Sequence, residues 1–373
     1  MTGEDGVLVD VIIAVHNARR PVGRAVRSAL VASARARVTV VCHNVESASI
    51  AAAIGDVAHD PRVRLIELHD GIASPSGPFN AGLDASSAQW LAIMGSDDEL
   101  ERGSVDAWLE RAHETGADVV LPTIVRRSRV DQVVATPPAR RGRDDRLDGI
   151  ADRLAYRSAP LGLMRRNAID GIRLAPGQSP GGDVIFTSRL YFSDRVITRH
   201  RGLGYIVHDD ADDRVTLAPR GVAHALRFVD DLLSDRWFRA QPESVRRAIV
   251  VKTLRVNVLG QFVNRPMPEH WNDDEREELT GIVSQLDIAG PGALARLSRA
   301  DRRLLDSLHP GSGVGADALV SLAKTRRRYG LPSTLLPRQL RYTFDPEAPM
   351  PMMVASWHTT RRDQRARRRL GRG

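Results

Sequence analysis

The chain has 373 residues, enough for two domains, and its 42% hydrophobic and 27% charged content is typical of a globular protein. Lys and Arg outnumber Asp and Glu by 54 to 46, but positions 361–373 alone hold seven arginines and one aspartate. The rest of the chain is therefore nearly neutral, which disfavours a nucleic-acid-binding surface spread over the whole protein. A single cysteine, Cys42, excludes an internal disulfide framework and a cysteine-cluster zinc site.

Apolar, β-branched segments alternate with helix-like segments over the first 125 residues. The pattern predicts strands at 7–15, 37–42, 63–68, 89–94 and 118–125, and helices at 22–34, 47–57, 78–85 and 104–114. Such an alternation predicts an α/β fold with a mostly parallel sheet and helices on both of its faces. Ligands of these sheets bind at the carboxyl ends of the strands. The turns 16–17, 42–44 and 96–98 all lie at such ends.

The pattern changes further along the chain. Residues 126–146, with two prolines and many arginines, predict a mobile loop. Helices are predicted at 183–192, 222–233, 243–262, 274–286 and 316–328. We therefore predict an α/β domain over 1–215, a helical domain over 216–348 and a basic, disordered tail over 349–373, with the first boundary near Thr216. The acidic N-terminus and the lack of an 18-residue apolar run predict a cytoplasmic protein without a membrane span.

The acidic segment Gly95-Ser96-Asp97-Asp98-Glu99 directly follows a predicted buried strand. Adjacent carboxylates are costly at such a place unless water, a cation or a metal compensates them. A hard divalent cation takes oxygen ligands and keeps waters or substrate phosphates in its shell, so this pair could hold a metal–diphosphate. Taken alone, the same residues also suit a helix N-cap with an acidic first turn.

Three runs in order, DVIIAVHN, VTVVCHN and GPFNAGLDASSAQWLAIMGSDD, resemble family 2 glycosyltransferases of the GT-A fold. That family has an Asn-x-Gly segment ahead of an apolar strand and a D-x-D or D-D motif, which Asn80-Ala81-Gly82 and Ser96-Asp97-Asp98 match. The resemblance covers about residues 7–210. It implies a GT-A-type (Rossmann-like) domain followed by an α-helical C-terminal region. It also implies inverting, metal-dependent sugar transfer from a nucleotide-diphosphate donor, with a UDP-sugar favoured.

The resemblance also implies roles for individual residues. The residues implied to line the nucleotide site are Val15, His16, Asn17, Asn44, Asn80 and Asp97. Asp98 and His208 are the implied ligands of Mn²⁺ or Mg²⁺, although His208 also suits a surface position beside solvated acids. The chain departs from the family at two points here. Gly95 replaces the first acid of the motif, and His43-Asn44 replaces an acidic turn that holds the base or ribose.

Asp183 opens a predicted helix at about the separation from Asp98 at which the family places its general base. Inverting transfer needs such a base on the acceptor hydroxyl, opposite the leaving diphosphate. The glutamate that precedes this base in the family is here Gly182. The alternative interpretation is that Asp183 only caps the helix.

Two other functions stay open at this point. A nucleotidyltransferase also combines an α/β sheet with acidic metal ligands, but the turn at 16–20 lacks the glycines such an enzyme carries there. A non-catalytic scaffold with a decayed site would explain Gly95 and Gly182.

The expected acceptor is a carbohydrate or polymer, as in cell-wall or capsular synthesis, and the helical region could form a homo-oligomer. Trp357 and the basic tail suggest peripheral contact with an anionic membrane, whereas only the tail favours nucleic acid.

Overall fold

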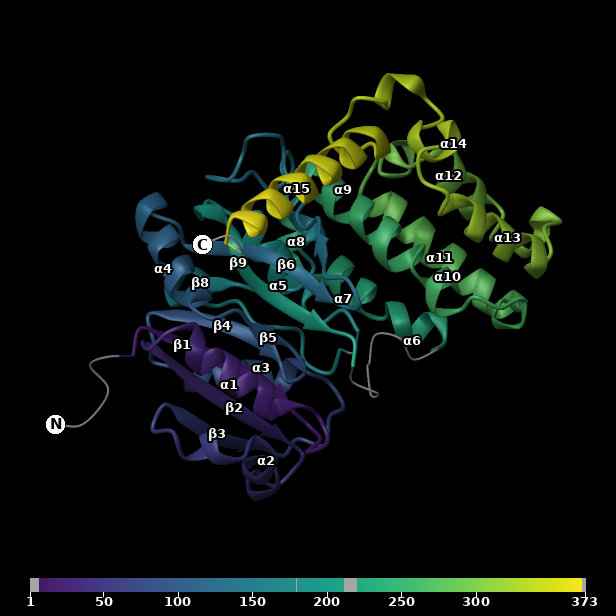
Figure 1. Ribbon diagram of the computed structural model, residues 1–373. Coiled ribbons are helices and arrows are strands. Elements are labelled where there is room, and N and C mark those ends of the chain that lie inside the picture. The colour runs from purple at the N-terminus through teal and green to yellow at the C-terminus, as the bar shows by residue number, and fades with distance from the viewer. Residues whose placement is uncertain (1–6, 179, 211–219, 371–373) are drawn as a thin grey trace.

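The computed structural model describes residues 7–178, 180–210 and 220–370, and it contains a sheet covered by helices beside a purely helical region (Figure 1). The strands are β1 Val9–Val15, β2 Ala36–His43, β3 Val63–Leu68, β4 Trp90–Gly95, β5 Glu99–Leu100, β6 Val119–Arg127, β7 Gln132–Val134, β8 Leu163–Arg165 and β9 Ile197–His208. Helices of the sheet region are α1 Val22–Ala32, α2 Ser47–Ile54, α3 Ser76–Ala85, α4 Ser104–Thr115 and α5 Val184–Tyr191. The α/β architecture predicted from the sequence is confirmed.

The sheet has the order β3-β2-β1-β4-β8-β6-β9-β5, and β7 pairs with β6. Strands β3, β2, β1 and β4 are parallel, as predicted. The second half is mixed, because β8 runs antiparallel to both of its neighbours and β5 antiparallel to β9, while β6 and β9 are parallel. The alternation that predicts parallel strands covers β1, β2, β3, β4 and β6, whereas the short β8 and the two-residue β5 carried no comparable signal.

Alternate residues of β1 face two different cores. Val9, Val11 and Ile13 pack with α1, α2 and α4, whereas Ile12 packs with α3 and α5. Both sets are fully buried, which explains why β1 is apolar except for Asp10, whose carboxylate accepts hydrogen bonds from Arg37 and Thr39. The helices therefore cover both faces of the sheet.

The C-terminal region forms its own core, centred on Trp271 and Leu279. Its helices are α6 Val222–Leu226, α7 Phe228–Ser234, α8 Arg236–Ala240, α9 Glu243–Lys252, α10 Gln261–Asn264, α11 Asp273–Ala289, α12 Arg299–Asp306, α13 Ala316–Arg326 and α14 Pro332–Leu335. A π-helical stretch, Thr253–Val258, joins α9 to α10. The predicted boundary near Thr216 lies outside the described residues. Across 7–178, 180–210 and 220–370, none of the helices has the length and apolar character needed to cross a membrane.

The prediction of a disordered tail is wrong for residues 349–370, which form the helix α15 (Pro349–Leu370). This helix lies along β9 (Figure 1). Asp363 is fully buried and accepts a hydrogen bond at 2.7 Å from Arg199, which is equally buried, and another from Arg201. Arg367 adds an ion pair with Glu101 at 2.6 Å. These pairings offset the basic charge that suggested disorder, and sequence patterns do not show contacts so distant along the chain.

We expect Asp363→Asn to lower the free energy of unfolding by about 3–5 kcal/mol, because it leaves the buried Arg199 guanidinium without its counter-charge. Urea denaturation of the full chain measures this change. Asp317→Asn removes an exposed acid with no such partner and should change stability by less than about 0.5 kcal/mol. Equal stabilities of the two variants would contradict the proposed role of the ion pair.

Candidate active site

Three neighbouring strands end at the same edge of the sheet. Val15 of β1 is in register with Cys42 of β2, and Ala14 of β1 with Gly95 of β4. The turns 16–17, 43–44 and 96–98 therefore gather at this edge, where the sequence placed the nucleotide contacts. In the first turn, Asn17 Oδ1 accepts the backbone N–H of the residue two positions on at 3.0 Å, which directs the chain into α1.

Two arginines hold the acidic turn from the side of α1. Arg20 Nη2 lies 2.7 Å from Asp97 Oδ1, and Arg20 Nε donates to Ser96 Oγ at 2.7 Å. Arg24 donates to the backbone carbonyl of Asp97. Asp97 is only 7% exposed, and its ion pair offsets the cost of burying the carboxylate. The sequence analysis missed both arginines; the signal was the basic run that directly follows the first strand.

Asp98 is held from the opposite side by β9. Tyr205 Oη donates to Asp98 Oδ2 at 2.6 Å and accepts the backbone N–H of Gly95 at 2.9 Å. The backbone N–H of His208 donates to Asp98 Oδ1 at 3.2 Å. Both donors are neutral, so they orient the carboxylate without cancelling its charge. Burial, reinforced by the charge of Asp98, raises the pKa of Tyr205 well above its ordinary value and keeps this hydroxyl a donor.

The imidazole of His208 lies beside a neighbouring acid of the turn. Its Nε2 lies 3.0 Å from Glu99 Oε2. Within the described parts of the chain, no three His, Cys, Asp or Glu side chains converge on one point as metal ligands. Asp98, Glu99 and His208 nevertheless offer two carboxylates and one imidazole, a donor set of the chemical kind that Mn²⁺ takes. Metal binding by Asp98 and His208 therefore remains a prediction.

An acid that follows the third strand lies beside the turn after the second strand. Asp70, two residues past β3, accepts hydrogen bonds at Oδ1 from His43 Nε2 at 2.8 Å and from the Asn44 amide at 3.3 Å. A backbone N–H bond from Ile72 and the bond from His43 lower the pKa of Asp70. Asn44 has a positive φ of 54°, which turns its side chain toward this cluster, and its Oδ1 accepts the N–H of Gly71. The sequence analysis did not single out Asp70, because the family pattern places the acid elsewhere.

The Asn-x-Gly segment has a structural role in this chain. Asn80 donates to the carbonyl of Leu174 at 2.9 Å and accepts its N–H at 3.0 Å. At Gly82 a Cβ atom would come within 2.3 Å of Ile12 on β1, so only glycine lets α3 approach the sheet this closely. The predicted contact between Asn80 and the nucleotide stays a prediction; the bonds that we observe fix the loop that leads to Asp183.

That loop is fixed at further points against the start of α3. Ser74 Oγ donates to the carbonyl of Gln178 at 2.6 Å, and Ala175 donates its N–H to the carbonyl of Gly182 at 2.8 Å. A Cβ atom on Gly182 would come within 2.2 Å of Ser76 Oγ. A glutamate in place of Gly182, as in the family motif, would therefore require the Ser76 hydroxyl to move away.

Asp183 precedes α5, but its side chain makes no capping hydrogen bond to the helix. The alternative that it serves only as an N-cap is thus not supported. Burial raises the pKa of Asp183, and the nearby charge of Lys252, at the end of α9, opposes this shift. Burial conversely lowers the pKa of Lys252, whose ammonium group also donates to Asn257 Oδ1 at 3.2 Å. The helical region thereby contributes a charge that affects a carboxylate of the sheet domain.

Comparison with known proteins agrees with this geometry. The family described as Glycosyl transferase family 2 matches residues 10–173. This part of the chain is a family 2 glycosyltransferase domain. The glycosyltransferase domain contains the acidic turn, the Asp70 cluster and α3, whereas Asp183, Tyr205 and His208 follow the matched range.

Relatives give two further comparisons. The succinoglycan biosynthesis protein ExoO of Rhizobium meliloti (strain 1021) is 34% identical over 116 residues, which span 31% of this chain and 33% of ExoO. The chain thus aligns with about a third of the length of that curated relative. Staphylococcus aureus TarS 1–349 in complex with UDP-GlcNAc aligns with a TM-score of 0.67 over 86% of this chain and 92% of TarS 1–349, at 13% identity. The same TarS segment in complex with UDP gives a TM-score of 0.64. At this identity the match shows a shared GT-A fold.

We expect Gly182→Ala to destabilise the protein by about 1–3 kcal/mol, because its Cβ would overlap Ser76 Oγ. Ser76→Gly in the same chain removes that oxygen and should recover most of the loss, which urea denaturation of the two single variants and the double variant measures. Additive effects of the two substitutions would show that the contact does not limit residue 182.

Proposed function

We propose that the chain is an inverting glycosyltransferase that moves a sugar from a nucleotide diphosphate to an acceptor hydroxyl. The observation that carries this proposal is the acidic turn at the end of β4, where Arg20 and Tyr205 fix the carboxylates of Asp97 and Asp98. A buried pair of carboxylates held at the carboxyl edge of a family 2 domain is suited to a metal–diphosphate.

Asp98, with His208 and Glu99 beside it, would hold the divalent cation. When bound there, Mn²⁺ or Mg²⁺ would neutralise the charge that develops on the leaving diphosphate. Asp97 would approach the ribose or the metal. Tyr205 prevents the carboxylate of Asp98 from turning away, and the ion pair with Arg20 fixes the carboxylate of Asp97.

Asp183 would act as the general base. Its partial burial raises the pKa of the carboxyl, which makes the ionised form a stronger proton acceptor than an exposed aspartate. It would take the proton of the acceptor hydroxyl while the oxygen attacks the anomeric carbon from the side opposite the diphosphate. The new glycosidic bond forms as the bond to the diphosphate breaks, so no covalent enzyme intermediate is needed.

The nucleotide is proposed to be UDP, with its base near the cluster of Asp70, His43 and Asn44. Asp70 Oδ1 already accepts three hydrogen bonds, whereas Oδ2 makes none to a described residue. One free acceptor oxygen matches the single imide N–H of uracil, whereas guanine presents two adjacent donors.

The TarS complexes hold UDP-GlcNAc and UDP, and ExoO is a succinoglycan biosynthesis protein. We propose a polysaccharide acceptor, in cytoplasmic assembly of a cell-wall polymer or exopolysaccharide.

A catalytically inactive scaffold is the second candidate, favoured by glycines where the family has acids. At Gly95 a Cβ atom would come within 2.6 Å of Asp98 Oδ2, and Gly182 is similarly confined by Ser76. A side chain at either position would therefore displace the neighbouring Asp98 or Ser76 side chain. The two glycines are compatible with an active site whose acids occupy other positions, and equally with a decayed site. A measurement of nucleotide binding distinguishes the transferase from the scaffold.

We expect isothermal titration to detect micromolar binding of UDP that requires Mn²⁺ and that is lost in Asp98→Ala. GDP should bind more weakly than UDP, because Asp70 leaves one acceptor oxygen for the base. Asp317→Ala, which removes an exposed acid of α13, is the matched control and should bind UDP like the wild type. Failure of both nucleotides to bind under every metal condition would overturn the transferase proposal and favour the scaffold.

We expect Asp183→Asn to lower kcat by about 10²–10⁴-fold while UDP binding persists, because an amide cannot accept the proton. In the wild type, the midpoint of the acidic limb of the pH profile of kcat/KM should lie above the ordinary pKa of an aspartate. The reason is that the raised pKa keeps Asp183 protonated, and therefore unable to accept a proton, up to a higher pH. Lys252→Met removes the opposing charge and should move this limb further up. Unchanged turnover in Asp183→Asn would exclude this residue as the base.

A further inference from the structure

The helix α15 has two faces of different character. Ala355, Thr359 and Asp363, spaced four residues apart, are buried against the sheet region. Val354, Trp357, Arg361, Arg365 and Arg368, spaced three or four apart, form a second stripe whose side chains are all exposed. Because Asp363 lies about half a turn from Arg361, the two stripes point in opposite directions. We refer to the stripe 354–368 as the outer face.

The outer face carries positive charge without a counter-charge on the same helix. Asp363 is the only acidic residue among positions 349–370. Its two carboxylate oxygens bind Arg199 and Arg201 inside the protein. The inward position of this one acid leaves Arg361, Arg365 and Arg368 facing solvent with no acid of α15 beside them.

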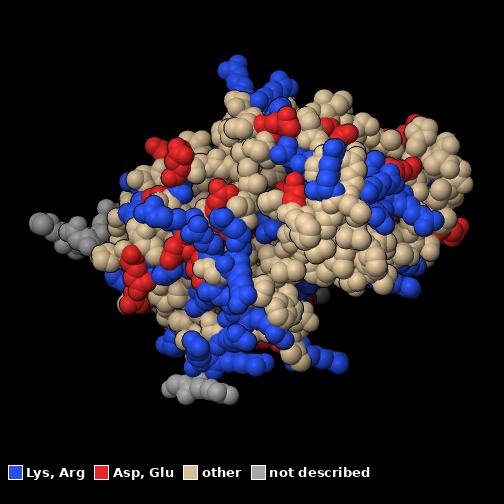
Figure 2. Space-filling model, turned by 90° about the horizontal axis from the view of Figure 1, so that it is seen from above, with Lys and Arg blue, Asp and Glu red and all other residues tan. Residues whose placement is uncertain are grey.

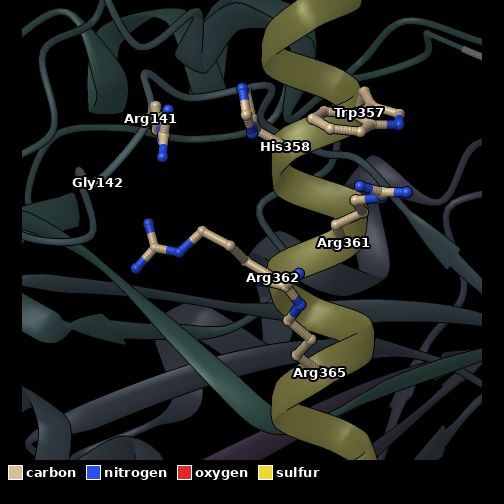
Figure 3. Close-up of a pocket in the computed structure, with 7 residues that line it drawn as sticks. All are labelled: Arg141, Gly142, Trp357, His358, Arg361, Arg362 and Arg365. Carbon is tan, nitrogen blue, oxygen red and sulfur yellow. The ribbon is translucent and has the colours of Figure 1, made fainter.

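The outer face borders a groove of about 380 Å³. In Figure 3, His358 and Arg362 extend from α15 toward Arg141, which comes from the loop opposite, whereas Trp357 and Arg361 lie together on the other side of the helix. Arg361 stacks over the Trp357 ring at 4.1 Å from its centroid. Seen from above, Lys and Arg form a stripe across this side of the molecule (Figure 2).

Large apolar side chains are exposed on α15 and in the segment that precedes it. Trp357 and Val354 are each 50% exposed. Leu340 and Phe344, in the segment that enters α15, are 60% and 81% exposed. This segment and α15 run along the top of the molecule in Figure 1. Exposed aromatic and aliphatic groups next to a basic stripe mark a surface that binds something both apolar and anionic.

We propose that the outer face of α15, with Leu340 and Phe344, docks the protein on the surface of an anionic lipid bilayer. Arginines near such a surface are each attracted by about 1 kcal/mol, and tryptophan favours the headgroup level of a membrane. A soluble polyanion would satisfy the arginines but would leave the apolar side chains in water. This inference goes beyond the proposed transfer reaction and does not depend on it, because the inner stripe fixes α15 independently of any nucleotide.

The test uses the full chain and vesicles of phosphatidylcholine alone or mixed in equal parts with phosphatidylglycerol. We expect flotation with the anionic vesicles only, and less of it as salt is raised. The triple variant Arg361→Glu, Arg365→Glu, Arg368→Glu should lower the partition coefficient on the order of 100-fold. A matched control reverses three exposed charges of the helical region, Arg303→Glu, Lys324→Glu and Arg327→Glu, and should bind anionic vesicles far better than the outer-face variant.

Fluorescence quenching by brominated lipid gives a second measurement. Quenching on anionic vesicles should occur in the wild type and be largely lost in Trp357→Phe, since Trp90, Trp108 and Trp271 are buried and Trp237, which is partly exposed, lies on α8 and not on the outer face. No flotation with anionic vesicles, or an equal loss in the outer-face and control variants, would overturn the proposal. Tight binding to soluble polyphosphate without vesicle binding would overturn it too and would assign the groove to a soluble polyanion. UDP titration of the outer-face variant should match the wild type, which separates this test from that of the transfer reaction.

Discussion

The hydrogen bond from Tyr205 to Asp98 joins the two halves of the sheet at the site. Asp98 follows β4, which belongs to the parallel half, whereas Tyr205 lies on β9 in the mixed half. The same hydroxyl accepts the N–H of Gly95, so one oxygen fixes both ends of the acidic turn. Any displacement of β9 would therefore move the carboxylate proposed to hold the metal.

The register of β9 depends in turn on buried charge. Arg199 and Arg201 lie toward the start of this strand and bind Asp363 of α15, while Tyr205 and His208 lie at its other end. Burial lowers the pKa of Arg199 to about 10, yet the nearby carboxylate of Asp363 keeps the charged form favoured at neutral pH. The C-terminal helix thus stabilises the strand that positions the acidic turn. The outer face of α15 is exposed and is the surface proposed to bind an anionic membrane. The same helix thus stabilises the site through its inner face and provides the proposed membrane contact through its outer face.

Two glycines that break the family pattern have a common physical cause. Asp98 occupies the space that a side chain on residue 95 would need, and Ser76 occupies the space beside residue 182. Asp70, after β3, accepts hydrogen bonds from His43 and Asn44, which stand where the family carries an acidic turn.

The sequence by itself determined the α/β class, the first parallel strands and the turns that gather at their carboxyl ends. It could do so because burial on both faces of a strand produces an apolar run that is visible locally. It also identified the glycosyltransferase family from the order and spacing of short motifs. Only the tertiary structure revealed Arg20, Asp70 and Tyr205 at the site, and only it turned the basic tail into a packed helix. Those outcomes depend on contacts between residues distant in the chain, such as Arg199 with Asp363, whose charges compensate each other only after folding brings them together.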